Sequence, residues 1–469
     1  MLNPVGPGFI KTASRSLRAA MAVLAAFILP GAPRAVAQDG PVALIRDSEI
    51  ESILKAEATP LLRAAGLNPD AVHIYIVNDR TLNAFVAGGQ NLFLNTGLIM
   101  KTKNPNELMG VMAHETGHMA GGHLVRSDEG MRAALVTQII TLGIGLAAAF
   151  AGGDPRGAAV IMASSGEFAT LQLFTYTRVQ ESSADQAAAT YLEASGRSGK
   201  GLVDFFRNFQ YEETFSDAKR DAFFRSHPLS SERIEALRET VTRAPHFETK
   251  DTSEDLAQHA LMIAKLKGYI NYPVETLNEF PETDTTFPAR YARAIAWYKD
   301  VETTKALEAL DALIKEQPEN PYLQEFKGQV LFERGRIREA EAPLRRAVEL
   351  APKASLIRIS FAQVLLATRT PDNVKEALDN LIPAVNLERE NGMGWRLLAD
   401  AYEQTGNSPM ARLATAEGAF NQGNMIDARN FARRAQELLT KDTPEYRRAS
   451  DIVNAAEGQV MRELRGRGG

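Results

Sequence analysis

No cysteine occurs in the 469 residues of this chain. The protein therefore cannot form disulfides, use a thiolate nucleophile or bind zinc through sulfur. Histidine is also scarce, but three of the seven histidines fall within the ten positions 114–123. Any metal site must be built from histidine, aspartate and glutamate, and this histidine cluster is the first candidate.

Basic residues are not in excess either. The 53 lysines and arginines stand against 58 aspartates and glutamates, a net charge of −5, which argues against a nucleic-acid partner. Apolar residues make up 45% of the chain and charged residues 24%, a balance typical of a chain that buries a core. The length exceeds that of one ordinary domain and predicts two or three.

The N-terminus has the pattern of an export signal. An apolar run at 19–29 follows three basic residues, Lys11, Arg15 and Arg18, and precedes the small-residue sequence Ala-Val-Ala that ends at Ala37. The alternative is a short membrane anchor, but an apolar run of 11 residues is too short to cross a bilayer. We predict a signal peptide over 1–37, cleaved after Ala37, and an exported mature chain, periplasmic if the host is a Gram-negative bacterium.

Two kinds of pattern follow the signal peptide. Residues 72–77 alternate as a strand does, residues 91–94 form a second short extended piece, and residues 106–123 have helical spacing. Beyond residue 251 the pattern is entirely helical. We predict a mostly helical α+β domain with a small sheet over 38–250, a helical linker over 251–284 and an all-α domain over 285–469.

The all-α region contains an internal repeat of 34 residues. Three residues recur at this period, so that Ala306, Leu310 and Pro318 return as Ala340, Leu344 and Pro352. The period is that of tetratricopeptide repeats, in which small residues let paired helices pack closely. A later copy contains Trp395 and Gly406, and the copy before it requires an insertion near 370–372. We predict a tetratricopeptide-repeat solenoid, which would bind proteins or peptides; the alternative is a helical bundle without repeats.

The sequence His114-Glu115-Thr116-Gly117-His118 is an HExxH motif. Four residues of α-helix turn through about 400°, so the two imidazoles lie on one face, one turn apart, as two ligands of one metal ion require. Glu115 is offset by one position and can take a proton from the attacking water without being a ligand. The alternative, a helix with incidental histidines, is much the weaker interpretation.

A third protein ligand must come from another segment. His123 follows His118 by five residues, about 500° of helix, so its ring points away from the ligand face and we assign it a structural or supporting role. Downstream, Glu181 and Asp185 are spaced i, i+4 on a predicted helix. One of these carboxylates can bind zinc while the other accepts a hydrogen bond from a ligand imidazole. A solvated acidic first turn of the helix is the alternative.

These motifs together resemble the M48 peptidases. The residues that carry the resemblance are the HETGH motif, the ESSAD segment 181–185, and His227-Pro228 followed by Arg233-Ile234. The family implies a zincin-like metallopeptidase domain, here followed by the all-α repeat solenoid. Carried over position by position, it implies His114, His118 and Glu181 as ligands of one Zn²⁺, Glu115 as the general base, and Asp185 as the partner of a ligand.

The role of His227 stays open among three possibilities. By resemblance to the family's periplasmic, repeat-containing members, it is a latency plug that fills the fourth zinc position and displaces the catalytic water. A protonated ring could instead stabilise the oxyanion. The third interpretation is a turn histidine before Pro228.

Residues 133–153 form an uncharged stretch of 21 residues, long enough to span a bilayer. A single span would separate His114 and His118 from Glu181, so only a hairpin over 133–176 is compatible with the proposed ligands. Glu167 and several glycines weaken that hairpin. We favour a helical segment near the active site that contacts membrane or substrate peripherally.

The leading hypothesis is a zinc endopeptidase of the cell envelope whose substrate lies extended beside an edge strand. We predict that strand to be formed by Asn91, Leu92, Phe93 and Leu94. The resemblance implies misassembled outer-membrane β-barrel proteins as clients, recruited by the repeats, and the barrel-assembly machinery as partner. The rival hypotheses are a chaperone or assembly factor with a latent protease, and an integral membrane protease.

Overall fold

The computed structural model describes residues 43–123, 178–215, 227 and 229–466. The predicted signal peptide, the apolar stretch 133–153 and the predicted hairpin over 133–176 lie outside these residues. None of the helices described is both long and apolar enough to cross a membrane.

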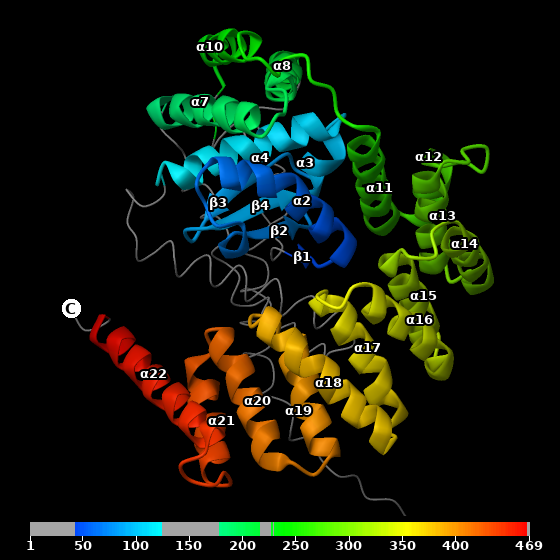
Figure 1. Cartoon of the computed structure of the whole chain (residues 1–469), viewed down its shortest axis with the longest axis vertical. Coiled ribbons are helices and arrows are strands. Elements are labelled where there is room, and N and C mark those ends of the chain that lie inside the picture. Colours follow the sequence, from blue (N-terminus) through cyan, green and yellow to red (C-terminus); the bar gives the residue numbers. More distant parts are fainter. Residues whose placement is uncertain (1–42, 124–177, 216–226, 228, 467–469) are drawn as a thin grey trace, which may run out of the picture. The chain divides into compact units, whose positions relative to one another are not determined.

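A four-stranded sheet lies at the base of the N-terminal domain (Figure 1). The strand order is β1-β2-β4-β3, with β2 and β4 parallel and the other pairs antiparallel. All of β3 and most of β4 are buried, as expected of strands covered on both faces. The bounds are β1 Leu44–Ile45, β2 His73–Val77, β3 Ala84–Ala87 and β4 Asn91–Asn95.

This sheet order corrects the predicted substrate strand. Residues 91–94 do form a strand, but β4 pairs with β2 along one side and with β3 along the other. Its backbone donors and acceptors are therefore already used, and Asn91, Leu92, Phe93 and Leu94 cannot pair with a substrate. The strand at the edge of the sheet beside β4 is β3.

Helices cover the sheet in layers. Helix α4 lies between the sheet and α7 (Figure 1) and contacts both β3 and α7. Residues 105–119 of α4 are all buried, so this helix is enclosed all round rather than amphipathic. The helices of this domain are α2 Ser48–Ala64, α3 Thr96–Lys101, α4 Pro105–Ala120, α7 Arg178–Ala194, α8 Lys200–Phe215 and α10 Ser231–Thr242.

Local sequence explains how α4 begins and how closely its neighbours approach. The Asn104 side chain accepts a hydrogen bond from the Glu107 amide, and Pro105 occupies the first turn, both ordinary N-terminal signals. A Cβ atom on Gly117 would lie 2.9 Å from the backbone oxygen of Ala184. Glycine at this position therefore lets α7 pack against α4 at the level of the histidines.

From residue 253 onward the described residues form helices only, apart from short connections. Successive helices pack in pairs, including α15 with α16, α17 with α18 and α19 with α20. The helices are α11 Ser253–Ile270, α12 Pro273–Glu279, α13 Phe287–Lys299, α14 Thr303–Glu316, α15 Pro321–Glu333, α16 Ile337–Leu350, α17 Ser355–Thr368, α18 Pro371–Leu387, α19 Gly392–Gln404, α20 Ser408–Asn421, α21 Met425–Gln436 and α22 Pro444–Gly466.

These pairs confirm the predicted repeat array. Ala306 and Leu310 are buried on α14, and Ala340 and Leu344 are buried at the equivalent positions of α16. A Cβ atom on Gly328 would lie only 2.4 Å from Leu344 Cγ, so the small residue is what allows α15 and α16 to touch. The insertion predicted near residues 370–372 falls at the start of α18, which is 17 residues long.

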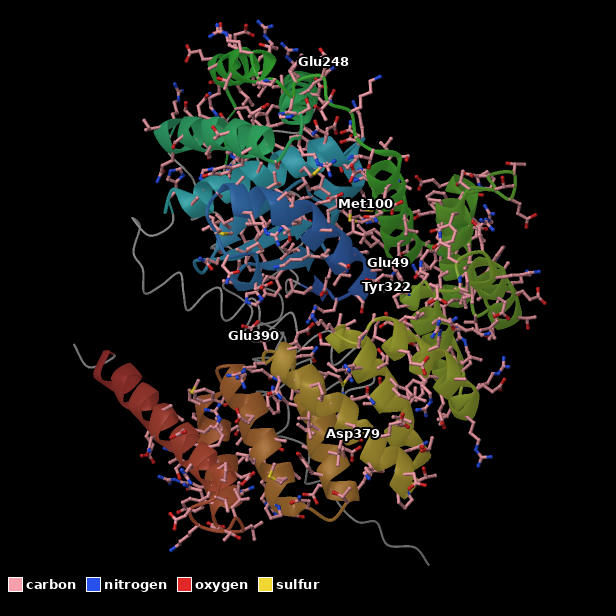
Figure 2. All side chains as sticks on the ribbon, viewed as in Figure 1. Glu49, Met100, Glu248, Tyr322, Asp379 and Glu390 are labelled. Carbon is pink, nitrogen blue, oxygen red and sulfur yellow. The ribbon has the colours of Figure 1, made fainter. Side chains whose placement is uncertain are left out.

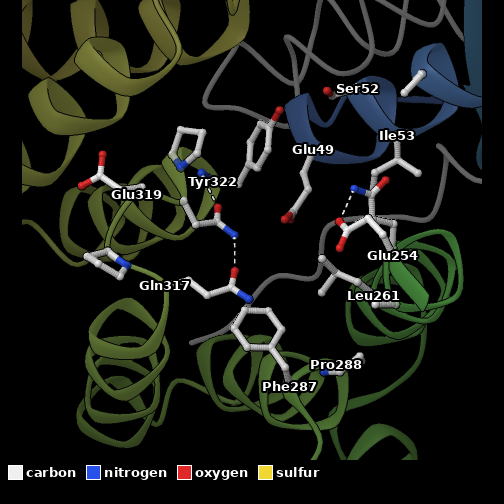
Figure 3. A pocket seen from close by; sticks show the side chains of 16 residues that line it. Glu49, Ser52, Ile53, Glu254, Leu261, Phe287, Pro288, Gln317, Glu319 and Tyr322 are labelled. Carbon is white, nitrogen blue, oxygen red and sulfur yellow. Dashed lines mark hydrogen bonds between the residues drawn. The ribbon is translucent and has the colours of Figure 1, made fainter. Parts of the chain in front are cut away.

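Helix α11 belongs to two cores at once. Met262 and Leu266 are buried in the core of the N-terminal domain, whereas Leu261 and Tyr269 pack against the first core of the repeats. The segment predicted as a linker is therefore a packed structural element. The same region lines an open cavity of about 580 Å³, with Leu261, Ile53 of α2 and Tyr322 of α15 among its walls (Figure 3).

Two polar contacts connect the N-terminal domain with the connection between α18 and α19. Arg46, which precedes α2, forms an ion pair with Glu388 at 2.9 Å. The Tyr75 hydroxyl on β2 donates a hydrogen bond of 3.0 Å to Glu390, which is labelled in Figure 2. These contacts join residues more than 300 positions apart in the sequence.

Candidate metal and catalytic site

Three elements bring the predicted site residues together. Helix α4 carries His114, Glu115 and His118, helix α7 carries Glu181, and His227 lies shortly before α10. All five side chains are buried, with at most 1% of each exposed. The ligand atoms of the three histidines and Glu181 lie within 4.8 Å of one another. The cluster can therefore hold a metal ion.

The distances within the cluster fit a tetrahedral ion. His114 Nε2 lies 3.2 Å from His118 Nε2 and 3.3 Å from His227 Nδ1. Glu181 Oε1 lies 3.3 Å from His118 Nε2 and 3.0 Å from His227 Nδ1. Zinc ligands at about 2.0–2.1 Å from the ion are separated from one another by about 3.3 Å in a tetrahedron. The donor set of three imidazoles and one carboxylate is also one that zinc accepts.

Asp185 orients the first histidine. Its Oδ1 lies 3.0 Å from His114 Nδ1, and because an ionised carboxylate only accepts, the ring donates from Nδ1. The lone pair of His114 then remains on Nε2, which faces the cluster.

His123 lies behind the second histidine and outside the set of four. Its Nδ1 is 3.0 Å from His118 Nδ1, on the ring edge opposite the one that faces the cluster. The predicted turn away from the ligand face is compatible with this position. The contact supports the orientation of His118 in the way that outer partners of ligand histidines usually do.

Glu115 is placed beside the cluster rather than in it. Its Oε1 lies 3.4 Å from His227 Nε2, and α4, which carries it, contacts β3. Burial raises the pKa of the Glu115 carboxyl above its ordinary value. A base whose pKa is raised toward the working pH accepts a proton more effectively.

Sequence reasoning did not assign a role to Arg233. Its guanidinium, on the first turn of α10, contacts Glu181 and Asp185 of α7. Its place in the Arg233-Ile234 motif after His227 was the signal available, but the contact joins segments whose approach the sequence does not reveal.

Comparison with known proteins agrees with this geometry. Residues 45–241 match peptidase family M48, a metallopeptidase family and the one that the motifs resemble. A relative from Vibrio cholerae is 27% identical over 78% of this chain and 75% of its own length. The beta-barrel assembly-enhancing protease of Escherichia coli strain K12 is 23% identical over 83% of this chain and 79% of that protein.

A solved structure is also similar to part of the chain. The structure titled MamA MSR-1 C2 covers 35% of this chain and 93% of its own, at 19% identity and a TM-score of 0.30. That score is too low to support an argument, so the assignment of the repeats rests on the packed helix pairs themselves. The relation to the beta-barrel assembly-enhancing proteases extends across both parts of the chain, since the matched length far exceeds residues 45–241.

Proposed function

We propose that this protein is a zinc-dependent endopeptidase of the periplasm that acts in protein quality control. The observation that carries the proposal is the buried set His114, His118, Glu181 and His227, whose donor atoms have the separations of a tetrahedral zinc site. Glu115 lies beside that set as the proposed base. An ion held by His114, His118 and Glu181 would leave one position for water and substrate.

The proposed chemistry assigns one task to each residue. Zinc supplies a Lewis acid that polarises the scissile carbonyl and makes water acidic enough to lose a proton near neutral pH. The Glu115 carboxylate takes the proton of the attacking water and passes it to the nitrogen of the leaving amine. His114, His118 and Glu181 hold their donor atoms toward one point, and Asp185 keeps His114 in the required tautomer.

We assign the substrate-binding edge to β3. The Asn95 amide donates to Asn83 O across the β3–β4 pair, so by alternation the backbone groups of Ala84 and Val86 point away from β4. Helix α4, which carries Glu115, contacts β3, so this edge lies near the proposed base. An extended peptide paired with β3 would be recognised mainly through its backbone, with little sequence specificity.

The clients proposed are misassembled outer-membrane β-barrel proteins, and the proposed partner of the repeats is the barrel-assembly machinery. The similarity to proteins named beta-barrel assembly-enhancing proteases supports this choice. A stacked helical array offers a long surface for protein partners, so the repeats would select the client and the N-terminal domain would cut it.

A second candidate function is favoured by His227. Its Nδ1 completes the set of four and its Nε2 faces Glu115, so with an ion bound this ring would take the position of the attacking water. A protein held in this state would work mainly as a chaperone or assembly factor, with proteolysis latent. The integral membrane alternative draws no support from the helices described.

The test combines metal analysis with one matched pair of variants. The purified protein should contain about one zinc per chain and should lose casein digestion on treatment with a chelator. Glu115→Gln should abolish digestion while zinc content stays the same. Glu107→Gln, on the same helix but at its N-terminal end, should retain digestion. Absence of zinc, or full activity of Glu115→Gln, would contradict the proposal.

The same variant separates the two candidate functions. If Glu115→Gln restores barrel assembly in a deletion strain, assembly does not require cleavage and the chaperone function is favoured. If it fails while wild-type protein succeeds, the peptidase activity is what matters in the cell.

A further inference from the structure

Arg233 is the basic residue of α10 that points into the buried site. Only 7% of it is exposed, and its amide donates to the Ser230 side chain that caps the helix. Its guanidinium carbon lies 5.7 Å from the centre of the Phe206 ring on α8. The cation is therefore fixed by an aromatic contact on one side and by the acidic residues of α7 on the other.

The guanidinium forms three interactions with two carboxylates. Its Nε and Nη2 donate to the two oxygens of Asp185, each at 2.8 Å. Its Nη1 lies 2.9 Å from Glu181 Oε2. Only the planar fork of arginine can satisfy both carboxylates in this way, because a lysine ammonium is a single point of charge.

These contacts make the two oxygens of Glu181 unequal. Oε1 lies 3.3 Å from His118 Nε2 and 3.0 Å from His227 Nδ1, whereas Oε2 lies 2.9 Å from Arg233 Nη1 and 3.5 Å from His114 Nε2. Arg233 thereby favours Oε1 as the principal ligand oxygen. A single-oxygen ligand is what a four-coordinate site with three nitrogen donors needs.

The same side chain also holds the partner of His114. Asp185 Oδ1 receives Arg233 Nη2 and lies 3.0 Å from His114 Nδ1. Glu181 and Asp185 are both buried and lie one helical turn apart, so without a cation between them their ionised forms would repel each other. Arg233 supplies a charge that is permanent at any working pH.

We propose that Arg233 is a positioning residue for the metal site, which orients Glu181 and Asp185 together and so determines how tightly the site binds zinc. It touches neither the reacting atoms nor the ion, and acts through the two carboxylates. The inference rests on the proposed function, since it concerns the ion on which that function depends.

The experiment measures metal affinity in the full chain. Zinc affinity is determined by competition with a chromophoric chelator, and the geometry of the site by the visible spectrum of the cobalt-substituted protein. Arg233→Met should weaken zinc binding by about 10- to 100-fold, the range usual for partners of metal ligands. Arg233→Lys, which keeps the charge but not the fork, should give an intermediate affinity and a changed cobalt spectrum.

Two further variants separate positioning from a general effect on folding. Arg238→Met changes an exposed arginine of the same helix whose partner is Glu235, and it should bind zinc like wild type. The double variant Arg233→Met, Asp185→Asn also removes the negative charge that Asp185 would carry without its arginine partner. The amide oxygen introduced at position 185 can still accept a hydrogen bond from His114. This double variant should recover at least about threefold in affinity over Arg233→Met, because contacting residues couple.

These measurements separate failure of the inference about Arg233 from failure of the proposed function. If wild-type protein binds neither zinc nor cobalt, both the function and the inference are wrong. If wild-type protein binds zinc and Arg233→Met binds it within threefold, with an unchanged cobalt spectrum, the inference alone is overturned. If Arg233→Met does not fold, Arg233→Lys takes its place in the experiment. A zinc affinity and a cobalt spectrum identical to those of wild type would then overturn the inference.

Discussion

At the scale of single residues, His227 is the side chain that is expected to hold the activity of the resting protein down. Its two ring nitrogens face opposite parts of the site, Nδ1 toward Glu181 at 3.0 Å and Nε2 toward Glu115 at 3.4 Å. This arrangement agrees better with a plug in the fourth position than with a turn histidine, because a turn histidine would not need to reach either carboxylate.

We therefore expect His227→Ala to raise casein turnover above that of wild type at equal zinc occupancy, since water gains access to the fourth position. His246→Ala serves as control, because His246 is half-exposed and pairs with Glu193 away from the site. A fall of about a hundredfold would instead indicate that His227 stabilises the transition state. Unchanged turnover would leave it only the role of a turn residue.

Glu57 on α2 is expected to make the stability of the fold depend on pH. Its side chain is buried, and neither oxygen has a hydrogen-bond partner among the described residues. Burial, reinforced by the charge of Asp255, raises the pKa of Glu57 to about 8. The folded state thus keeps a proton that the unfolded chain has already lost between about pH 4.5 and 8.

The free energy of unfolding should accordingly fall as the pH rises through that interval, by a contribution of up to a few kcal/mol from this group. Glu57→Gln cannot ionise, so its urea midpoint should be higher than that of wild type at pH 8 and similar at pH 5. Parallel pH profiles for the two proteins would show that Glu57 is not the group responsible.

At the scale of elements, the edge strand β3 is where substrate backbone is expected to pair. The Ala84 amide, which faces away from β4, would donate one hydrogen bond to an extended peptide, and proline at this position removes that donor without breaking the ladder to β4. One such hydrogen bond contributes about 0.5–1.5 kcal/mol.

Ala84→Pro should therefore raise KM for a peptide substrate by about 3- to 10-fold with little change in kcat. Ala84→Ser, which retains the amide in a side chain of similar size, should behave like wild type. Steady-state kinetics on a fluorogenic peptide would measure both constants. Identical KM values for the proline and serine variants would mean that the substrate does not pair with this part of β3.

At the scale of the whole molecule, the N-terminal domain extends beyond its last predicted motif, Arg233-Ile234, and includes part of α11. Met262 and Leu266 of α11 are fully buried in the core of that domain. A chain that stops at Arg243 lacks both side chains, and the loss of a buried apolar side chain of this size costs about 2–5 kcal/mol.

A chain ending at Asn271, after α11, should thus be more stable in urea than one ending at Arg243. The longer chain should digest unfolded casein but fail to recruit clients, since the packed helix pairs downstream are absent. Urea titration and a client pull-down measure the two properties. Equal urea midpoints, or client capture equal to that of the full chain, would contradict this division of labour.

Much of the site could be predicted from residues close together in the sequence. The spacing of His114 and His118 places both rings on one face of any helix they occupy, because helical geometry is local. The same holds for Glu115, offset by one position, and for Glu181 and Asp185 on α7. The 34-residue period predicted the repeats for a similar reason, since each repeat packs only against its neighbours.

What the sequence by itself determined is therefore the local geometry: which side chains share a helix face and which segments repeat. Only the tertiary structure decided that Arg233 joins Glu181 and Asp185, that β4 is interior and β3 lies at the edge, and that α11 completes the first core. Each of these depends on contacts between residues tens of positions apart, and such contacts are set by how buried surfaces pack together, which no local spacing records.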